Sequence, residues 1–171
     1  MLTRRTFGLA GLGLVAAAAG EFRTTGARAN EETMSTTTKV AFEITKTPEE
    51  WKKILSPAAF AVMREEDTER PWTSALLDEH RKGTFNCAGC ALPLYASETK
   101  FDSGTGWPSF FDVLPSAVGK KDDNTLFTTR TEVHCRRCGG HLGHVFDDGP
   151  QPTGLRYCMN GVALAFAPAA A

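Results

Sequence analysis

Two cysteine pairs with the same spacing constrain this chain more than any other feature. They are Cys87-x-x-Cys90 and Cys135-x-x-Cys138, and 44 residues separate them. Four thiolates complete a closed tetrahedral site, the arrangement typical of structural zinc. We therefore predict one structural Zn²⁺ per chain, held by these four cysteines. It would fasten the first strand to the middle of the sheet and add folding free energy.

Other uses of paired cysteines fit the sequence less well. Haem attachment requires a histidine directly after the second cysteine of a pair, but Ala91 and Gly139 stand there. A thioredoxin-type redox pair requires a strand-helix-strand context that this region lacks. Two structural disulfides remain an open alternative, because cysteines of exported proteins are often oxidised.

Cys158 is the fifth cysteine and lies in a run that resembles a half-buried strand. Alternate side chains of a strand share a face, so Arg156, Cys158 and Asn160 would project to one site. Tyr157 and Met159 would then point into the core. The charge of Arg156 would favour the thiolate, which is the reactive form of cysteine. The alternative is an inert buried thiol, since free cysteine is often buried.

The first 29 residues have the pattern of an export signal. Arg4-Arg5 precedes a weakly apolar run over residues 7–20, and Ala27-Arg28-Ala29 resembles a cleavage site. This arrangement indicates twin-arginine export and a periplasmic or otherwise exported protein. The run is too short for a membrane anchor. We predict a flexible leader over residues 30–45 and a single domain over residues 46–167.

The charge of the exported chain argues against nucleic acid as a partner. Without residues 1–29 the chain keeps 15 basic and 19 acidic residues, a net charge of about −4. Binding to phosphate backbones depends on basic side chains, so a zinc-ribbon nucleic-acid module is disfavoured. No other apolar run approaches the length of a membrane span, so no membrane partner is expected after removal of the signal.

The sequence predicts helices first and strands afterwards. Thr47-Pro48 and Ser56-Pro57 are typical helix starts, and a third short helix would hold Leu76, Leu77 and His80. Residues 120–124 read as a charged turn. Strands are expected over residues 84–86, 110–113, 126–134, 144–146, 155–159 and 162–166.

His141 and His144 follow the second cysteine pair within a glycine-rich segment. They could bind metal, but four cysteines already complete the site, so proton transfer near neutral pH is the more economical role. From residue 47 to residue 166 the chain resembles the methionine-R-sulfoxide reductases. The resemblance rests on the two cysteine pairs and on the segments 97–104, 106–110 (Gly-Trp-Pro-Ser-Phe), 131–133, 141–146 (His-Leu-Gly-His-Val-Phe) and 156–160 (Arg-Tyr-Cys-Met-Asn).

This resemblance implies a mainly β fold with two antiparallel sheets of the β-tent type, short N-terminal helices and the structural zinc site. It also implies an enzyme that reduces the R epimer of methionine sulfoxide, with Cys158 as the nucleophile that becomes a sulfenic acid. Trp107 would receive the S-methyl group, although an ordinary core tryptophan is the alternative. The remaining implied site residues protonate or orient the substrate or flank the nucleophile: His144, His141, Asp148, Arg156 and Asn160.

Thr105 stands where many family members carry a second, resolving cysteine. With four cysteines assigned to zinc and one to catalysis, we expect an external reductant, either a thioredoxin-like protein or a small thiol. The substrate would be an oxidised protein or free methionine-R-sulfoxide, and the enzyme a monomer. The main alternative is a non-catalytic, zinc-containing β-tent binding module, because fold alone does not establish activity.

Overall fold

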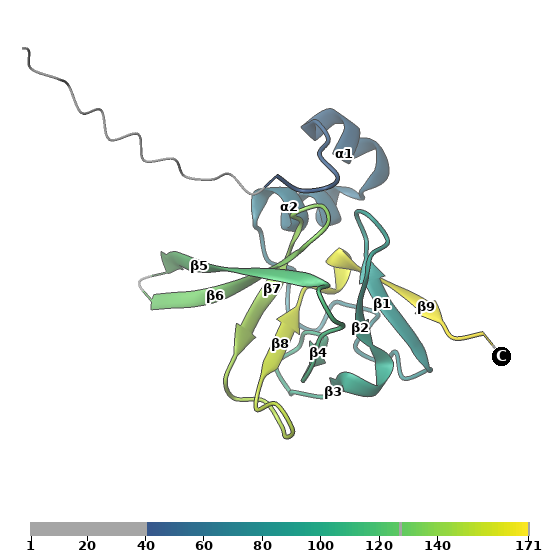
Figure 1. Ribbon diagram of the computed structural model, residues 1–171, viewed down its shortest axis with the longest axis vertical. Coiled ribbons are helices and arrows are strands. Elements are labelled where there is room, and N and C mark those ends of the chain that lie inside the picture. The colour runs from purple at the N-terminus through teal and green to yellow at the C-terminus, as the bar shows by residue number, and fades with distance from the viewer. Residues whose placement is uncertain (1–40, 127, 171) are drawn as a thin grey trace, which may run out of the picture. The chain divides into compact units, whose positions relative to one another are not determined.

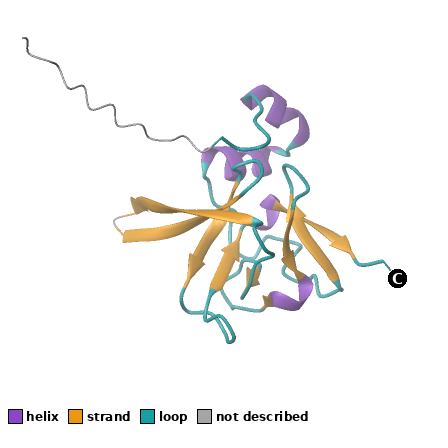
Figure 2. Ribbon diagram, in the orientation of Figure 1, coloured by secondary structure: helices purple, strands orange, loops and turns teal. Residues whose placement is uncertain are grey.

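Two antiparallel sheets meet beneath a pair of short helices (Figures 1 and 2). The computed structural model describes residues 41–126 and 128–170, and within them the helices are α1 (Pro48–Ile54) and α2 (Pro57–Glu65). The smaller sheet has the order β2 (Pro93–Ala96), β1 (Gly83–Cys87), β9 (Leu164–Pro168). The larger sheet has the order β3 (Lys100–Phe101), β4 (Ser109–Phe110), β8 (Arg156–Met159), β7 (His141–Phe146), β6 (Thr128–Cys135), β5 (Val118–Leu126). The predicted mainly β fold with two antiparallel sheets is confirmed.

The two helices begin as their sequences predict. The side chain of Thr47 accepts a hydrogen bond from the backbone of Glu50, and the Glu50 carboxylate accepts one from Thr47, which completes a capping box. Ser56 caps α2 through the backbone N–H of Ala59. Trp51 of α1 is buried against the rest of the fold. None of the helices within the described residues is both long and apolar enough to span a membrane.

Aromatic side chains fill the space between the sheets. Tyr95 of β2 stacks on Phe110 of β4 with ring centroids 4.3 Å apart, and Phe85 of β1 meets the same ring edge-on at 4.9 Å. The Tyr95 hydroxyl donates a hydrogen bond to the sulfur of Met159 at 2.9 Å. Tyr157 and Met159 are both buried, which confirms the predicted inward face of β8.

Four local predictions are wrong. Residues 71–82 contain turns and no helix, so Leu76, Leu77 and the exposed His80 lie on a long loop between α2 and β1. The predicted charged turn at residues 120–124 is part of β5, which pairs with β6. Residues 111–113 leave the sheet after Phe110, and a short 3-10 helix, η2 (Gly161–Ala163), precedes β9.

The predicted export signal over residues 1–29 and the leader up to residue 40 lie outside the described residues. The last part of the predicted leader contacts the body. The backbone N–H of Ile44 donates to the carbonyl of Arg137 at 3.0 Å, and Glu43 forms an ion pair with Arg136.

Candidate active site and metal centre

The four paired cysteines form one cluster. Their sulfur atoms all lie within 4.8 Å of one another, with Cys87 Sγ 3.7 Å from Cys138 Sγ and Cys90 Sγ 3.5 Å from Cys135 Sγ. A tetrahedral zinc ion with Zn–S bonds of about 2.3 Å places sulfurs about 3.8 Å apart, so the cluster fits this ion. The same spacing does not fit disulfides, whose sulfurs are about 2.05 Å apart.

The cluster bridges the two sheets, which corrects the expectation of a clip within one sheet. Cys87 is the last residue of β1 in the smaller sheet, and Cys135 is the last residue of β6 in the larger one. Each pair occupies one tight turn, with Gly139 at a φ of +67° that favours glycine. The turn after β1 and the turn after β6 are therefore held together by the same four sulfurs.

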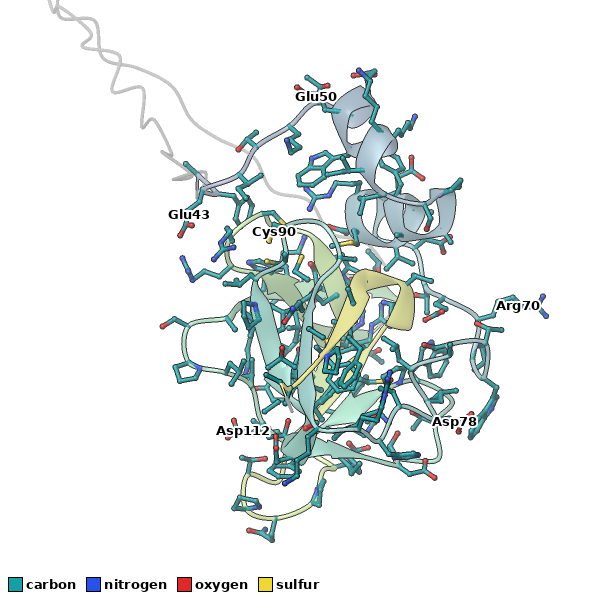
Figure 3. The ribbon with its side chains drawn as sticks, turned by 90° about the vertical axis from the view of Figure 1, so that its right-hand side faces the viewer. Glu43, Glu50, Arg70, Asp78, Cys90 and Asp112 are labelled. Carbon is teal, nitrogen blue, oxygen red and sulfur yellow. The ribbon has the colours of Figure 1, made fainter. Side chains whose placement is uncertain are left out.

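Helix α2 covers the cluster through Arg64. The guanidinium donates to the carbonyl oxygen of Cys138 at 3.1 and 3.2 Å and lies 3.6 Å from its sulfur. The same group lies over the ring of Trp51, 4.3 Å from its centroid. The positive charge beside a set of thiolates is favourable, so the helices and the cluster stabilise one another. Figure 3 shows Cys90 at the end of the protein that carries the helices, below Glu50 and to the left of the helices.

Cys158 lies on β8 at the bottom of a separate pocket. It pairs with Ser109 of β4 on one side and with His144 of β7 on the other. The pocket has a volume of about 130 Å³. It is lined by Thr68, Trp107, Arg130, Gly143, His144, Phe146, Cys158 and Asn160. The structure thus brings together Cys158, His144, Trp107 and Asn160, four of the residues that the sequence singled out.

Cys158 rests as a neutral thiol. Burial raises the pKa of the Cys158 thiol, and hydrogen bonding by Thr105 and the charge of Arg156 offset only part of this effect. Arg156 is engaged elsewhere, because its guanidinium makes two 2.8 Å hydrogen bonds to the Asp148 carboxylate. Arg156 therefore acts in the expected direction, and the opposing effect of burial is larger.

A raised pKa predicts slow alkylation of Cys158 at neutral pH. The rate with iodoacetamide should rise about tenfold per pH unit and should still be rising at about pH 8.5, the ordinary pKa of a cysteine thiol. Mass spectrometry of peptides from the zinc-loaded protein would locate the adduct and give the rate at each pH. A rate that is constant from pH 6.5 upward would contradict a neutral resting thiol.

A chain of hydroxyl groups leads to Cys158. The Thr105 hydroxyl lies 3.9 Å from the Cys158 sulfur and 2.8 Å from the Ser103 hydroxyl. The Ser103 hydroxyl lies 2.7 Å from that of buried Ser109, which also lowers the pKa of Cys158. The residue in the place of a resolving cysteine is therefore in direct contact with the nucleophile.

His144 is oriented by a carboxylate that the sequence did not reveal. Its Nε2 atom lies 2.8 Å from the Asp123 carboxylate, which also accepts from Arg130 at 2.6 Å. Hydrogen bonds from Thr125, His144 and Arg130 hold the pKa of Asp123 well below its usual range. Burial lowers the pKa of His144 and Asp123 offsets part of this effect, so His144 is neutral at pH 7 beside a permanent negative charge.

Three predicted site residues do not line the pocket. His141 is buried, with Nδ1 3.2 Å from the Glu132 carboxylate but not aligned for a hydrogen bond. Asp148 is exposed and pairs with Arg156, whose guanidinium lies over the ring of Phe146. Phe146 itself lines the pocket, so Arg156 and Asp148 act indirectly: they hold the Phe146 ring in place.

The loop between α2 and β1 closes the pocket from above. The indole N–H of Trp107 donates to the Glu69 carbonyl at 2.9 Å, and the Asn160 side chain accepts from the Glu69 backbone N–H at the same distance. Trp107 is half-buried, so it is not an ordinary core tryptophan. Sequence reasoning missed Thr68 and Asp123, because each lies in a segment whose pattern signalled only a solvated loop or turn. It also missed Arg130, because a charged residue within a predicted strand gave no sign that it faces the pocket.

Gly143 allows β7 to approach the nucleophile strand. Its φ is +154°, and a Cβ at this position would lie 2.1 Å from the carbonyl oxygen of Cys158. A side chain would therefore push β8 away from β7 and separate Cys158 from His144. The glycine was visible in the sequence, but its role depends on the register of the two strands.

Comparison with known proteins agrees with this site. Residues 55–168 match the SelR domain. Over 124 residues, 72% of this chain and 87% of the relative, the chain is 53% identical to "Peptide methionine sulfoxide reductase MsrB" of Methanosarcina barkeri. The protein of the same name from Leifsonia xyli subsp. xyli is 53% identical over 76% of this chain and 95% of its own length. That from Agrobacterium fabrum is 49% identical over 74% and 94%.

Proposed function

The chain belongs to the SelR domain family of methionine-R-sulfoxide reductases, and from this premise we propose how its own residues reduce the substrate. The observation that carries the proposal is the pocket in which Cys158 lies between Trp107 and His144. The test is reduction of each epimer of N-acetyl-methionine sulfoxide with dithiothreitol as reductant. We expect turnover of the R epimer only.

Proton transfer comes first, because both Cys158 and His144 rest in their neutral forms. His144 binds Asp123 through Nε2, which leaves Nδ1 to accept the thiol proton. The imidazolium formed beside the ionised Asp123 is stabilised by its charge, so the transfer is favoured by the same pair that orients the ring. The Cys158 thiolate therefore forms only when His144, on the neighbouring strand β7, has taken up the thiol proton.

Oxygen transfer follows. The Cys158 thiolate forms a bond to the electrophilic sulfur of the sulfoxide, and His144 returns the proton to the sulfoxide oxygen, which becomes a hydroxyl. This hydroxyl then moves to the Cys158 sulfur as its bond to the substrate sulfur and the sulfur–sulfur bond break, which leaves a sulfenic acid on Cys158 and releases methionine. The substrate sulfur gains two electrons and the cysteine sulfur loses two, so atoms and charge balance.

Trp107 and Phe146 give the pocket an apolar side. The S-methyl group of the substrate would lie against this side while the oxygen faces His144, an orientation that only one epimer can adopt together with attack by Cys158. Trp107 is fixed by its hydrogen bond to Glu69, so its ring is held in position before substrate binds. Epimer selection thus rests on one rigid aromatic wall.

Regeneration needs an external thiol, because the other cysteines are in the metal cluster. One thiol of the reductant condenses with the sulfenic acid, which releases water and forms a mixed disulfide, and a second thiol reduces it. A thioredoxin-like protein or a small thiol can supply both. We further propose Zn²⁺ as the ion bound by Cys87, Cys90, Cys135 and Cys138, with a structural role only, since all four positions around it are filled by protein.

The contact between Thr105 and Cys158 gives a direct test of this regeneration step. After one equivalent of sulfoxide without reductant, the wild-type protein should carry one added oxygen on Cys158 and no internal disulfide. Thr105→Cys should instead lose two hydrogens, because its new sulfur would stand close to Cys158. Intact-mass and peptide mass spectrometry distinguish these products.

Thr105→Ser is the matched control for that experiment, because it keeps the hydroxyl and adds no thiol. It should accumulate the oxygenated form like the wild type. An internal disulfide to Cys158 in the wild-type protein would contradict the proposed regeneration, since a cluster cysteine would then act as the resolving thiol.

A further inference from the structure

A second pocket adjoins the Cys158 pocket and shares Trp107 with it. Its volume is about 280 Å³. Its other walls come from the loop between α2 and β1 and from β3 with the residue that follows it, and include Trp72, Asp78, His80, Lys100 and Asp102. Because Trp107 lines both pockets, the second pocket is a direct neighbour of the one that holds Cys158.

Trp72 is held exposed at the edge of this second pocket. Its indole is 64% exposed, and its backbone φ is +65°, a conformation that a bulky residue rarely adopts. The Trp72 backbone N–H donates to the Gly106 carbonyl at 2.8 Å, and the ring packs on Gly106, where a Cβ would lie 2.9 Å from the indole nitrogen. An exposed aromatic ring fixed in a strained conformation next to a substrate pocket indicates a binding role.

The charges around Trp72 are mainly negative. Asp78 is exposed and forms no ion pair within the described residues, and Figure 3 shows it on the outer loop. Asp102 is also exposed and accepts only a local hydrogen bond from Gly104. Lys100 also lines the second pocket, and its ammonium donates to the Leu77 carbonyl at 2.8 Å; burial lowers its pKa, and the charges of Asp102 and Asp78 offset part of this effect. The second pocket therefore presents two exposed carboxylates and one half-buried ammonium beside an aromatic face, an excess of negative charge.

We propose that the second pocket binds the polypeptide that flanks the oxidised methionine and prefers a cationic side chain there. This inference rests on the proposed function, because it assumes that the sulfoxide occupies the Cys158 pocket. An arginine or lysine within two residues of the sulfoxide would lie over Trp72 and pair with Asp78 and Asp102. The preferred substrate is then an oxidised methionine in a basic stretch of polypeptide.

The experiment compares blocked pentapeptides that carry methionine-R-sulfoxide with arginine, alanine or glutamate on either side. We expect kcat/KM for the best arginine peptide to exceed that of its glutamate counterpart about tenfold, mostly through KM. The ratio should shrink at high salt, because the charges are exposed. Trp72→Ala and Asp78→Asn should each lower the ratio about threefold, with unchanged turnover of N-acetyl-methionine-R-sulfoxide.

Matched variants separate this effect from general changes in surface or charge. Ile54→Ala removes another exposed apolar side chain, and Asp122→Asn removes another exposed carboxylate; neither residue lines the second pocket. Both should keep the tenfold ratio. Circular-dichroism melting would confirm that all four variants are folded.

Two negative outcomes have different meanings. If no variant and no wild-type protein reduces any sulfoxide, the proposed function fails. If the wild-type protein reduces all peptides with equal kcat/KM, or if Trp72→Ala and Asp78→Asn keep the full ratio, the proposed function stands and the peptide subsite is overturned.

Discussion

Cys158→Ser is expected to abolish reduction of methionine-R-sulfoxide, with a loss of kcat on the order of 10³-fold or more. A serine hydroxyl is a far weaker nucleophile toward sulfur than a thiolate. Its oxygen also cannot take up the sulfoxide oxygen, whereas the cysteine sulfur does so and becomes a sulfenic acid. His144 and Asp123 would remain in place, but no proton transfer could generate a reactive thiolate. The measurement is turnover of the R epimer with dithiothreitol, followed by detection of methionine.

The same variant should leave the fold intact. Cys158 lies on the pocket side of β8, while its neighbours Tyr157 and Met159 carry the packing between the sheets. The melting temperature and zinc content should therefore match those of the wild type. A fully active Cys158→Ser protein would refute the assignment of Cys158 as the nucleophile. If Cys158→Ser does not fold, Cys158→Ala takes its place in the same assay.

The sequence predicted those parts of the site that depend on local spacing. Two residues between paired cysteines place both sulfurs in one turn, so the spacing alone predicts the four-cysteine cluster that could hold a metal ion. The alternation of Arg156, Cys158 and Asn160 likewise separated the pocket side of β8 from its buried side. The family resemblance then supplied the two-sheet fold, which spacing alone does not determine.

Sequence reasoning failed where distant segments meet. Asp123 was assigned to a charged turn, because its neighbours are polar, and only the pairing of β5 with β6 and of β6 with β7 brings it to His144. The loop that carries Glu69 has no hydrophobic periodicity, so its role in fixing Trp107 and Asn160 was not visible in the sequence. The charge of Arg156 lowers the pKa of Cys158 as expected, but the burial that raises this pKa and the contact of the guanidinium with Asp148 were not visible in the sequence.

Cys135→Ser is expected to remove both the zinc ion and most of the stability of the fold. Structural zinc sites bind with apparent free energies of about 10–16 kcal/mol, whereas whole domains are stable by about 5–15 kcal/mol. Loss of one ligand also disrupts the cluster of side chains that ties the end of β1 to the end of β6. We expect substoichiometric zinc by elemental analysis and a melting temperature lower by more than about 10 °C.

Cys158→Ser is the matched control for this prediction, because it makes the same chemical change outside the cluster. Comparison of the two serine variants separates zinc from the disulfide alternative. If Cys87, Cys90, Cys135 and Cys138 formed disulfides, the wild-type protein would lack zinc, and reducing agent alone would lower its melting temperature. With a zinc site, reducing agent has no such effect, while a chelator destabilises the wild type and Cys158→Ser equally. A zinc-replete Cys135→Ser protein with unchanged melting would exclude the four-cysteine site, since a tetrahedral ion cannot lose one of its four sulfurs without losing affinity.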